Sequence, residues 1–258
     1  LKCQFGTMAK PFHAGMAAST GVESATLAAL GFVARPDAIE CAGGFATTHG
    51  AGQGCLDNSF DGLPEAFRFV DVQYKFHACC HGTHPALEAL QGLREQHRLT
   101  AGDVEHVTLA IAPQWLPVCC IAQPATGLEA KFSLALTGAM VLAGVDTASL
   151  ASFSDACCQD PALTDLARRI EIHPDPAITD TACHATVLTR SGATLSRHVD
   201  LSTPVPYDTK ATKLKAKAGA LLGQARAEAL WTFVAALDTL PAAALYPRLH
   251  DWFADAAA

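Results

Sequence analysis

A lysine and a histidine stand three residues apart near the start of the chain, at Lys10 and His13. They belong to residues 6–15, in which a turn containing glycine runs into a helix of small residues. Such a turn can direct both side chains into one cavity, where an ammonium group binds an anion and an imidazole transfers a proton. The alternative is a surface lysine whose stem lies along the helix, next to a histidine that makes only structural hydrogen bonds.

A second lysine, Lys75, precedes a turn rich in histidine and cysteine at residues 76–85. His84 precedes Pro85 in this turn and is predicted to cap a helix that starts at Ala86. The positive end of a helix dipole would keep its imidazole neutral and able to exchange one proton. His84 is therefore a second candidate for proton transfer, while Lys75 by itself could be an ordinary charge at the end of a strand.

The same turn has the crude spacing of a zinc site. Its possible ligands are His77, Cys79, Cys80, His81 and His84. No second pair of ligands follows at a fixed distance, so a metal is not predicted.

A third block, residues 129–134, places Lys131 and Ser133 at the start of a long apolar helix. Taken in order, the three blocks resemble the MmgE/PrpD family, whose members include 2-methylcitrate dehydratase, cis-aconitate decarboxylase and iminodisuccinate epimerase. The resemblance continues through residues 204–210 into the closing helices, so it covers nearly the whole chain. Leu136 stands where many relatives carry a tyrosine, so one hydroxyl that could contact the substrate is missing.

The resemblance implies that Lys10 and Lys75 lie in a cleft between a helical domain and a lid and bind substrate carboxylates there. Each lysine would stabilise the dianion that forms when a proton leaves a carbon next to a carboxylate. His13 and His84 are the implied proton-transfer groups. The further substrate contacts that we expect are those of His81, Lys131 and Ser133.

The activity implied is that of a cofactor-independent lyase or isomerase acting on a small di- or tricarboxylic acid. Loss of hydroxide, loss of carbon dioxide and reprotonation on the other face all begin with the same proton abstraction, and the sequence does not choose among them. The first substrate that we predict is 2-methylcitrate, which would make the protein a dehydratase.

Members of this family begin with a long all-helical segment that precedes the block at residues 6–15. We therefore expect the chain to be the C-terminal portion of a longer protein or the product of a split gene. The competing hypothesis is a truncated, catalytically incomplete homologue, or a subunit that needs a separate N-terminal helical chain. Further catalytic groups of the family belong to that segment.

The periodicity of apolar residues predicts an α+β fold. We expect helices at 14–30, from about 36–37, at 84–97, at 131–143 and from 208 onward, and strands at 104–112 and 169–173 with a hairpin of 185–190 and 194–199. The helix at 16–30 carries few charges and is predicted to pack against neighbours on most sides, ending at Gly31. Residues 1–70 are assigned to a helical domain, 71–203 to an inserted lid, and 204–258 to helices that return to the helical domain.

Composition restricts the possible partners. The formal net charge is −7 and the 18 lysines and arginines are scattered, which argues against nucleic-acid binding. No apolar run is long enough to cross a bilayer without interruption. Six of the ten cysteines stand in adjacent pairs, and there is no Cys-x-x-Cys, which favours reduced thiols and a cytoplasmic protein over disulfides or an iron–sulfur cluster.

The apolar faces of the outer helices predict association. Met16, Leu27, Leu30 and the face at residues 230–237 would lack partners if the first helical segment is absent. An uncovered apolar patch favours burial against another chain. We therefore expect a homodimer or a complex with a complementary N-terminal chain.

Overall fold

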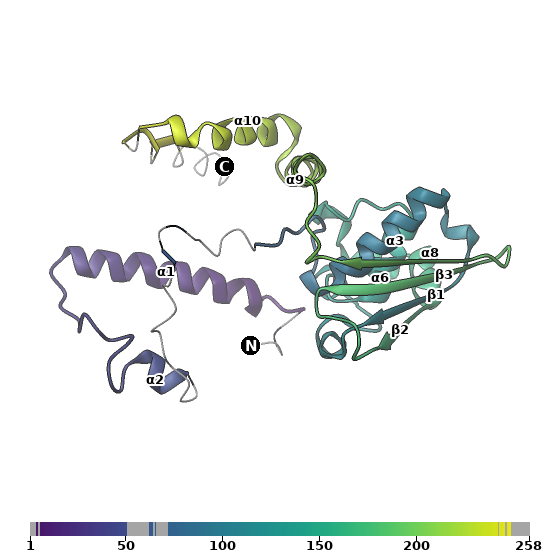
Figure 1. The fold of residues 1–258 in the computed structure, drawn as a ribbon, viewed down its shortest axis with the longest axis horizontal. Helices are drawn as coiled ribbons and strands as arrows, with labels where there is room; N and C mark the ends of the chain where they lie inside the picture. Colours follow the sequence, from purple (N-terminus) through teal and green to yellow (C-terminus); the bar gives the residue numbers. More distant parts are fainter. Residues whose placement is uncertain are drawn as a thin grey trace. The chain divides into compact units, whose positions relative to one another are not determined.

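The computed structural model describes residues 4, 6–50, 62–63, 65, 72–241, 243–245 and 247–248. The chain divides into two compact units, of which the first spans Thr7–Gln73 and the second runs from Tyr74 to the C-terminus. The two are described separately below (Figure 1). The domain boundaries predicted at residues 70 and 203 stay predictions.

The first unit is dominated by the long helix α1 (Ala9–Ala29), followed by the short helix α2 (Phe45–His49). The end of α1 matches the prediction, since Gly31 has φ of +89° and follows the last helical turn. The N–H groups of Gly31 and Phe32 donate to the carbonyls of Ala28 and Leu27, which satisfies two of the last carbonyl groups of the helix.

Two expectations for this unit are wrong. No residue of α1 is buried, although its small-residue composition predicted a helix packed on most sides. Few charges make such a helix suitable for burial, but burial requires a covering element, and the described residues of the first unit supply none. Residues 36–40 form turns rather than a helix, next to an exposed ion pair between Arg35 and Asp37, and α2 begins only after Gly44.

The second unit is built on a four-stranded sheet with the order β2-β1-β3-β4. Its strands are β1 (Val104–Ile111), β2 (Ile170–Pro174), β3 (Ala182–Thr189) and β4 (Thr194–Asp200). β1 pairs in parallel with β2 and antiparallel with β3, and β3 pairs antiparallel with β4. All four strands confirm the sequence prediction, and the β3–β4 hairpin turns at Gly192, where φ is +86°.

Three helices cover one face of this sheet: α3 (His84–His97), α6 (Leu134–Leu142) and α8 (Pro161–Ala167) (Figure 1). α3 packs on β3 and β4, while α6 packs on α3, α8 and β2. The alternation of β1 follows from this one-sided cover, since Val104, Val107, Leu109 and Ile111 are buried and the residues between them are more exposed. α6 begins three residues later than predicted.

The shorter helical segments connect these elements. They are the 3₁₀ turns His81–Thr83, Ala101–Asp103, Pro113–Trp115, Leu150–Ser152 and Leu237–Thr239, and the helices α4 (Leu116–Cys119), α5 (Gly127–Ala130) and α7 (Asp155–Gln159). Helices α9 (Tyr207–Leu222) and α10 (Gln224–Ala235) follow the sheet and meet at Gly223. The mixture of helices and one sheet confirms the α+β class, and the lid arrangement stays a prediction.

The outer helices expose apolar side chains, as the sequence predicted. Met16, Leu27 and Leu30 of the first unit are 49%, 48% and 80% exposed, and Val234 and Leu237 of the second are 52% and 36% exposed. Within the described part of the chain, no helix combines the length and apolar character needed to cross a membrane.

Candidate functional site

The turn that follows Lys75 is fixed by backbone hydrogen bonds to two distant segments. The N–H of Ala78 donates to the carbonyl of Thr147 at 2.7 Å, and the N–H of Cys80 donates to the carbonyl of Lys131 at 2.9 Å. Thr83 closes the turn by donating its hydroxyl to the carbonyl of Cys80 at 2.8 Å. The second and third sequence blocks, together with the segment after α6, therefore meet around this turn.

His84 is held at the core end of the turn and is 1% exposed. Its Nε2 accepts the backbone N–H of His77 at 3.2 Å, and its Nδ1 lies 3.0 Å from the carbonyl of Cys80, to which it donates. Burial, followed by the neighbouring His77, lowers the pKa of His84 to about 3. The ring is therefore neutral, as predicted, but burial is the main cause. The predicted cap position is wrong by one residue, because Thr83 is the cap and His84 the first helical residue.

Lys75 and His81 stand near this turn on its more exposed side. The ammonium group of Lys75 donates to the carbonyl of Cys79 at 3.0 Å. Burial, followed by the charge of Lys75, lowers the pKa of the half-buried His81. The His81 and His84 rings are 5.3 Å apart. Lys75 and His81, both predicted site residues of the second block, are therefore close enough for the lysine charge to affect the histidine.

Lys131 and Ser133, the predicted residues of the third block, have different surroundings. The ammonium of Lys131 lies 5.8 Å from the centre of the Phe153 ring. Ser133 is fully buried and caps α6 by accepting the N–H of Leu136 at 3.3 Å. Leu136 is 2% exposed and belongs to the hydrophobic core.

A third lysine, Lys217, joins Lys75 and Lys131 from helix α9. Burial is the main cause of its lowered pKa, and the charges of Lys75 and Lys131 lower it further, while Cys79 and Asp146 oppose the shift. Sequence analysis missed Lys217 because α9 carries several lysines. The signal that could have found it is its spacing from Lys213, since residues four apart share a helix face.

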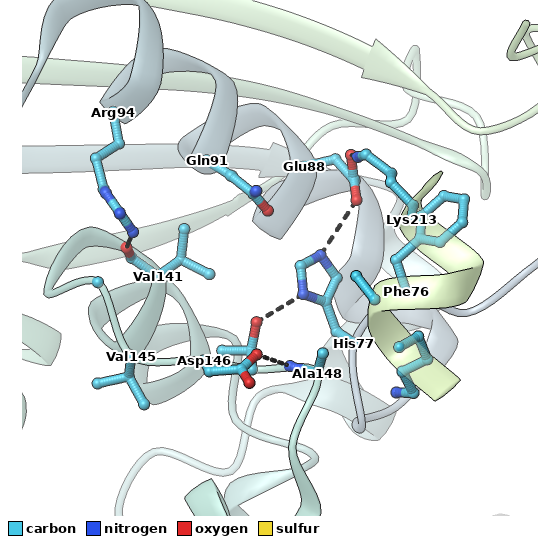
Figure 2. A pocket seen from close by; sticks show the side chains of 14 residues that line it. Phe76, His77, Glu88, Gln91, Arg94, Val141, Val145, Asp146, Ala148 and Lys213 are labelled. Carbon is cyan, nitrogen blue, oxygen red and sulfur yellow. Dashed lines mark hydrogen bonds and ion pairs between the residues drawn. The ribbon is translucent and has the colours of Figure 1, made fainter. Parts of the chain in front are cut away.

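Lys217 lines a cavity of about 290 Å³. It lies among α3, the segment after α6, and α9, and Figure 2 shows the His77 ring between Glu88 and the segment that carries Asp146. The residues around it are Phe76, His77, Glu88, Gln91, Arg94, Val141, Gly144, Val145, Asp146, Thr147, Ala148, Lys213, Ala216 and Lys217.

The polar wall of the cavity is a chain of contacts from Thr147 to Lys213. His77 is 4% exposed, and its Nδ1 lies 2.7 Å from the hydroxyl of Thr147. Its Nε2 lies 3.3 Å from Oε1 of Glu88, whose other oxygen pairs with Lys213. Burial alone would raise the pKa of Glu88, but the contacts with His77 and Lys213 outweigh it and bring the pKa to about 2. Glu88 is therefore ionised in this wall.

Lys10 and His13 belong to the other unit, at the start of α1, and both side chains are exposed. A cleft shared by Lys10 and Lys75 stays a prediction. Among the described residues, no group of three or more histidine, cysteine or acidic side chains could hold a metal ion. In the turn itself, burial raises the pKa of Cys79 to about 11, so this thiol is protonated.

The geometry agrees with a comparison to known families. The MmgE/PrpD C-terminal domain matches residues 77–239. The chain belongs to the MmgE/PrpD family. The matched residues include every residue that lines the cavity except Phe76, and all of helix α9, whereas Lys75 stands two residues before the match. No curated protein matches the chain.

Proposed function

We propose that the protein is a cofactor-independent lyase or isomerase of the MmgE/PrpD type that acts on a small di- or tricarboxylic acid. The observation that carries the proposal is that Lys217 lines a cavity together with the buried His77 and Glu88, and that the charges of Lys75 and Lys131 act on Lys217. Three cations that repel one another are stabilised together by an anion with several negative charges. A polycarboxylate has that property, and the family includes dehydratases and related lyases.

The reaction would start with removal of a proton from the carbon next to a carboxylate. Lys75 and Lys131 would bind carboxylates and stabilise the negative charge that develops on them. Lys217 is the candidate to accept the proton, because it lines the cavity and burial lowers its pKa. Lys10 and His13 would complete the site from α1, and His81 would contact a carboxylate beside Lys75.

His84 and Ser133, both predicted site residues, bond to backbone groups, which indicates that they support the site rather than react in it. His84 uses both ring nitrogens on the backbone, and Ser133 uses its hydroxyl on the first turn of α6. We propose that both fix the segments that carry Lys75 and Lys131, rather than react with the substrate.

The test is turnover by the chain of 2-methylcitrate, with formation of the conjugated acid followed by ultraviolet absorbance, and of cis-aconitate and iminodisuccinate, with the products separated by chromatography. We expect 2-methylcitrate to be the best substrate. Lys75→Met, which keeps the stem and removes the charge, should lower kcat about a hundredfold, or about 2.7 kcal/mol. Lys215→Met is the matched control, since Lys215 lies over the Trp231 ring and does not line the cavity.

The outcomes separate the hypotheses. Turnover that survives Lys75→Met would contradict the proposed role of this lysine. Turnover that requires an added N-terminal helical segment would instead support the reading of the chain as an incomplete enzyme. Failure of the wild-type chain to bind any polycarboxylate would contradict the proposed function itself.

A further inference from the structure

Two pairs of adjacent cysteines meet beside the turn that follows Lys75. One pair is Cys79 and Cys80 in the turn itself, and the other is Cys119 and Cys120 at the end of α4. All four are thiols in the structure. Helix α4 packs on the 3₁₀ turn that directly follows Cys80, so the two pairs lie on neighbouring segments.

The segment at residues 131–133 joins the two pairs through the backbone. The N–H of Cys80 donates to the carbonyl of Lys131 at 2.9 Å. Cys120 forms an isolated antiparallel bridge with Ser133. Main-chain contacts therefore hold the turn and the end of α4 in one arrangement.

Within this arrangement, the thiols of Cys80 and Cys119 are in contact. They share a hydrogen bond which, followed by burial, raises the pKa of Cys119. Cys79 has a different partner, since its sulfur lies 3.0 Å from the hydroxyl of Thr83. Adjacent cysteines can bridge each other only with strain. Cys80 and Cys119 are therefore the pair whose sulfur atoms can join after a small movement.

The surroundings of these two thiols suit oxidation in two steps. Cys80 is partly exposed, whereas Cys119 is fully buried. Burial lowers the pKa of His81 and raises that of Cys79 to about 11, and in both residues the charge of Lys75 acts to lower the pKa. The positive charge thus reaches both neighbours of Cys80, and a nearby cation favours the thiolate, which is the form that reacts with oxidants.

We propose that Cys80 and Cys119 form a redox-sensitive pair that a peroxide converts into a disulfide. In the first step the sulfur of Cys80 bonds to one peroxide oxygen while the O–O bond breaks. The thiol proton joins the departing oxygen, which leaves a sulfenic acid on Cys80 and one water molecule.

In the second step the sulfur of Cys119 attacks the sulfur of Cys80. The S–S bond forms, the S–O bond breaks, and the hydroxide leaves with the thiol proton of Cys119 as a second water molecule. The two sulfur atoms lose two electrons in total, and the peroxide gains them. A dithiol reductant reverses the change by thiol–disulfide exchange. The disulfide would tie the turn that follows Lys75 to α4.

The test maps the disulfide in the whole chain after treatment with hydrogen peroxide. The remaining thiols are blocked with N-ethylmaleimide, and the chain is digested with trypsin without reduction. Trypsin cuts after lysine and arginine, so the two cysteine pairs fall in separate peptides, residues 76–94 and 99–131. Mass spectrometry should show these peptides joined, with fragment ions that place the bond between Cys80 and Cys119, and dithiothreitol should separate them.

Substitution of single cysteines assigns the bond. Cys119→Ser should lower the yield of joined peptides more than about tenfold, because the serine hydroxyl cannot form the second bond. Cys120→Ser is the matched control and should keep the yield. If Cys119→Ser does not fold, Cys80→Ser gives the same comparison at a partly exposed position.

Three results would overturn the inference: no joined peptides from the wild type, a bond that maps to other cysteines, or a full yield in the folded Cys119→Ser or Cys80→Ser variant. None of these measurements depends on substrate binding. Their failure would therefore leave the proposed function intact.

Discussion

The turn at residues 77–84 has a buried histidine at each end, and the two rings differ in whether they contact backbone groups or side chains. His77 and His84 are 4% and 1% exposed, and their rings pack edge to face at 5.1 Å. His84 contacts backbone groups on both nitrogens, which fixes it in one neutral form. His77 contacts side chains and borders a cavity. The partners of a histidine therefore distinguish a ring fixed by the backbone from a ring that meets side chains beside a cavity, where burial does not.

Replacement of His84 should have the largest effect on the stability of the protein. His84→Asn leaves the N–H of His77 without its acceptor and opens a cavity in the core. We expect a loss of about 3 kcal/mol in the free energy of unfolding, measured by urea denaturation. His77→Phe should cost clearly less, because the ring volume is kept. A similar cost for both variants would remove the contrast between the two rings.

The glycine between the two histidines is expected to matter next. A Cβ atom at Gly82 would lie 2.5 Å from the Trp115 ring, and the indole N–H of Trp115 is held by the carbonyl of Asp180. Because the ring cannot easily move, Gly82→Ala should cost about 2 kcal/mol in the free energy of unfolding. Gly102→Ala is the control, since its Cβ would meet only Thr100 at 3.6 Å. Equal costs would mean that the turn adjusts freely.

The pH dependence of stability should report on His84. Its pKa is about 3 in the folded protein, below the value of about 6.5 for an unfolded chain. Between these values the unfolded state binds a proton that the folded state does not, so stability falls as the pH falls. From pH 7 to pH 5 the expected loss is about 2 kcal/mol.

His84→Asn should remove most of this pH step, which urea denaturation at the two pH values would show. The contribution of Glu88 is lost only as the pH falls below the ordinary glutamate range toward about 2, so it does not enter this window. A full-sized step in the variant would assign the effect to other groups.

The smallest effect on stability is expected for a substitution of Thr147, the hydroxyl partner of His77 beside the cavity. Thr147→Val should cost about 1 kcal/mol in the free energy of unfolding, since it removes one buried hydrogen bond without changing volume. It should leave the pH step of His84 unchanged. Loss of that step would show that the two ends of the turn respond as one unit.

Most elements of the second unit could be predicted from the sequence. The strand at Val104–Ile111 and the helix at His84–His97 carry apolar residues at the spacing of a strand and a helix, and that spacing depends only on neighbouring residues. The hairpin predicted between residues 190 and 194, which turns at Gly192, and the helix end at Gly31 depend equally on local backbone geometry. The helix predicted near Pro36 is wrong, since residues 36–40 form turns beside an exposed ion pair between Arg35 and Asp37.

The candidate site could be predicted only in part, because it depends on residues that are far apart in the chain. Lys75, His81, His84 and Lys131 stand in short blocks whose residue types indicate anion binding. Lys217 and Glu88 gave no such signal, because a lysine on a helix of many lysines and a glutamate on an amphipathic helix both resemble surface residues. Their burial depends on α9 lying against the same cavity as α3.

The sequence by itself determined the family, the order of helices and strands, and the gathering of lysines and histidines into three blocks, since each depends on residues close together in the chain. The tertiary structure decided which histidine faces a cavity and which is locked to the backbone. His77 meets Thr147 and Glu88, whereas His84 meets only the turn itself. Protonation depends on charges and hydrogen-bond partners within a few ångströms, and folding brings those partners from segments distant in the chain.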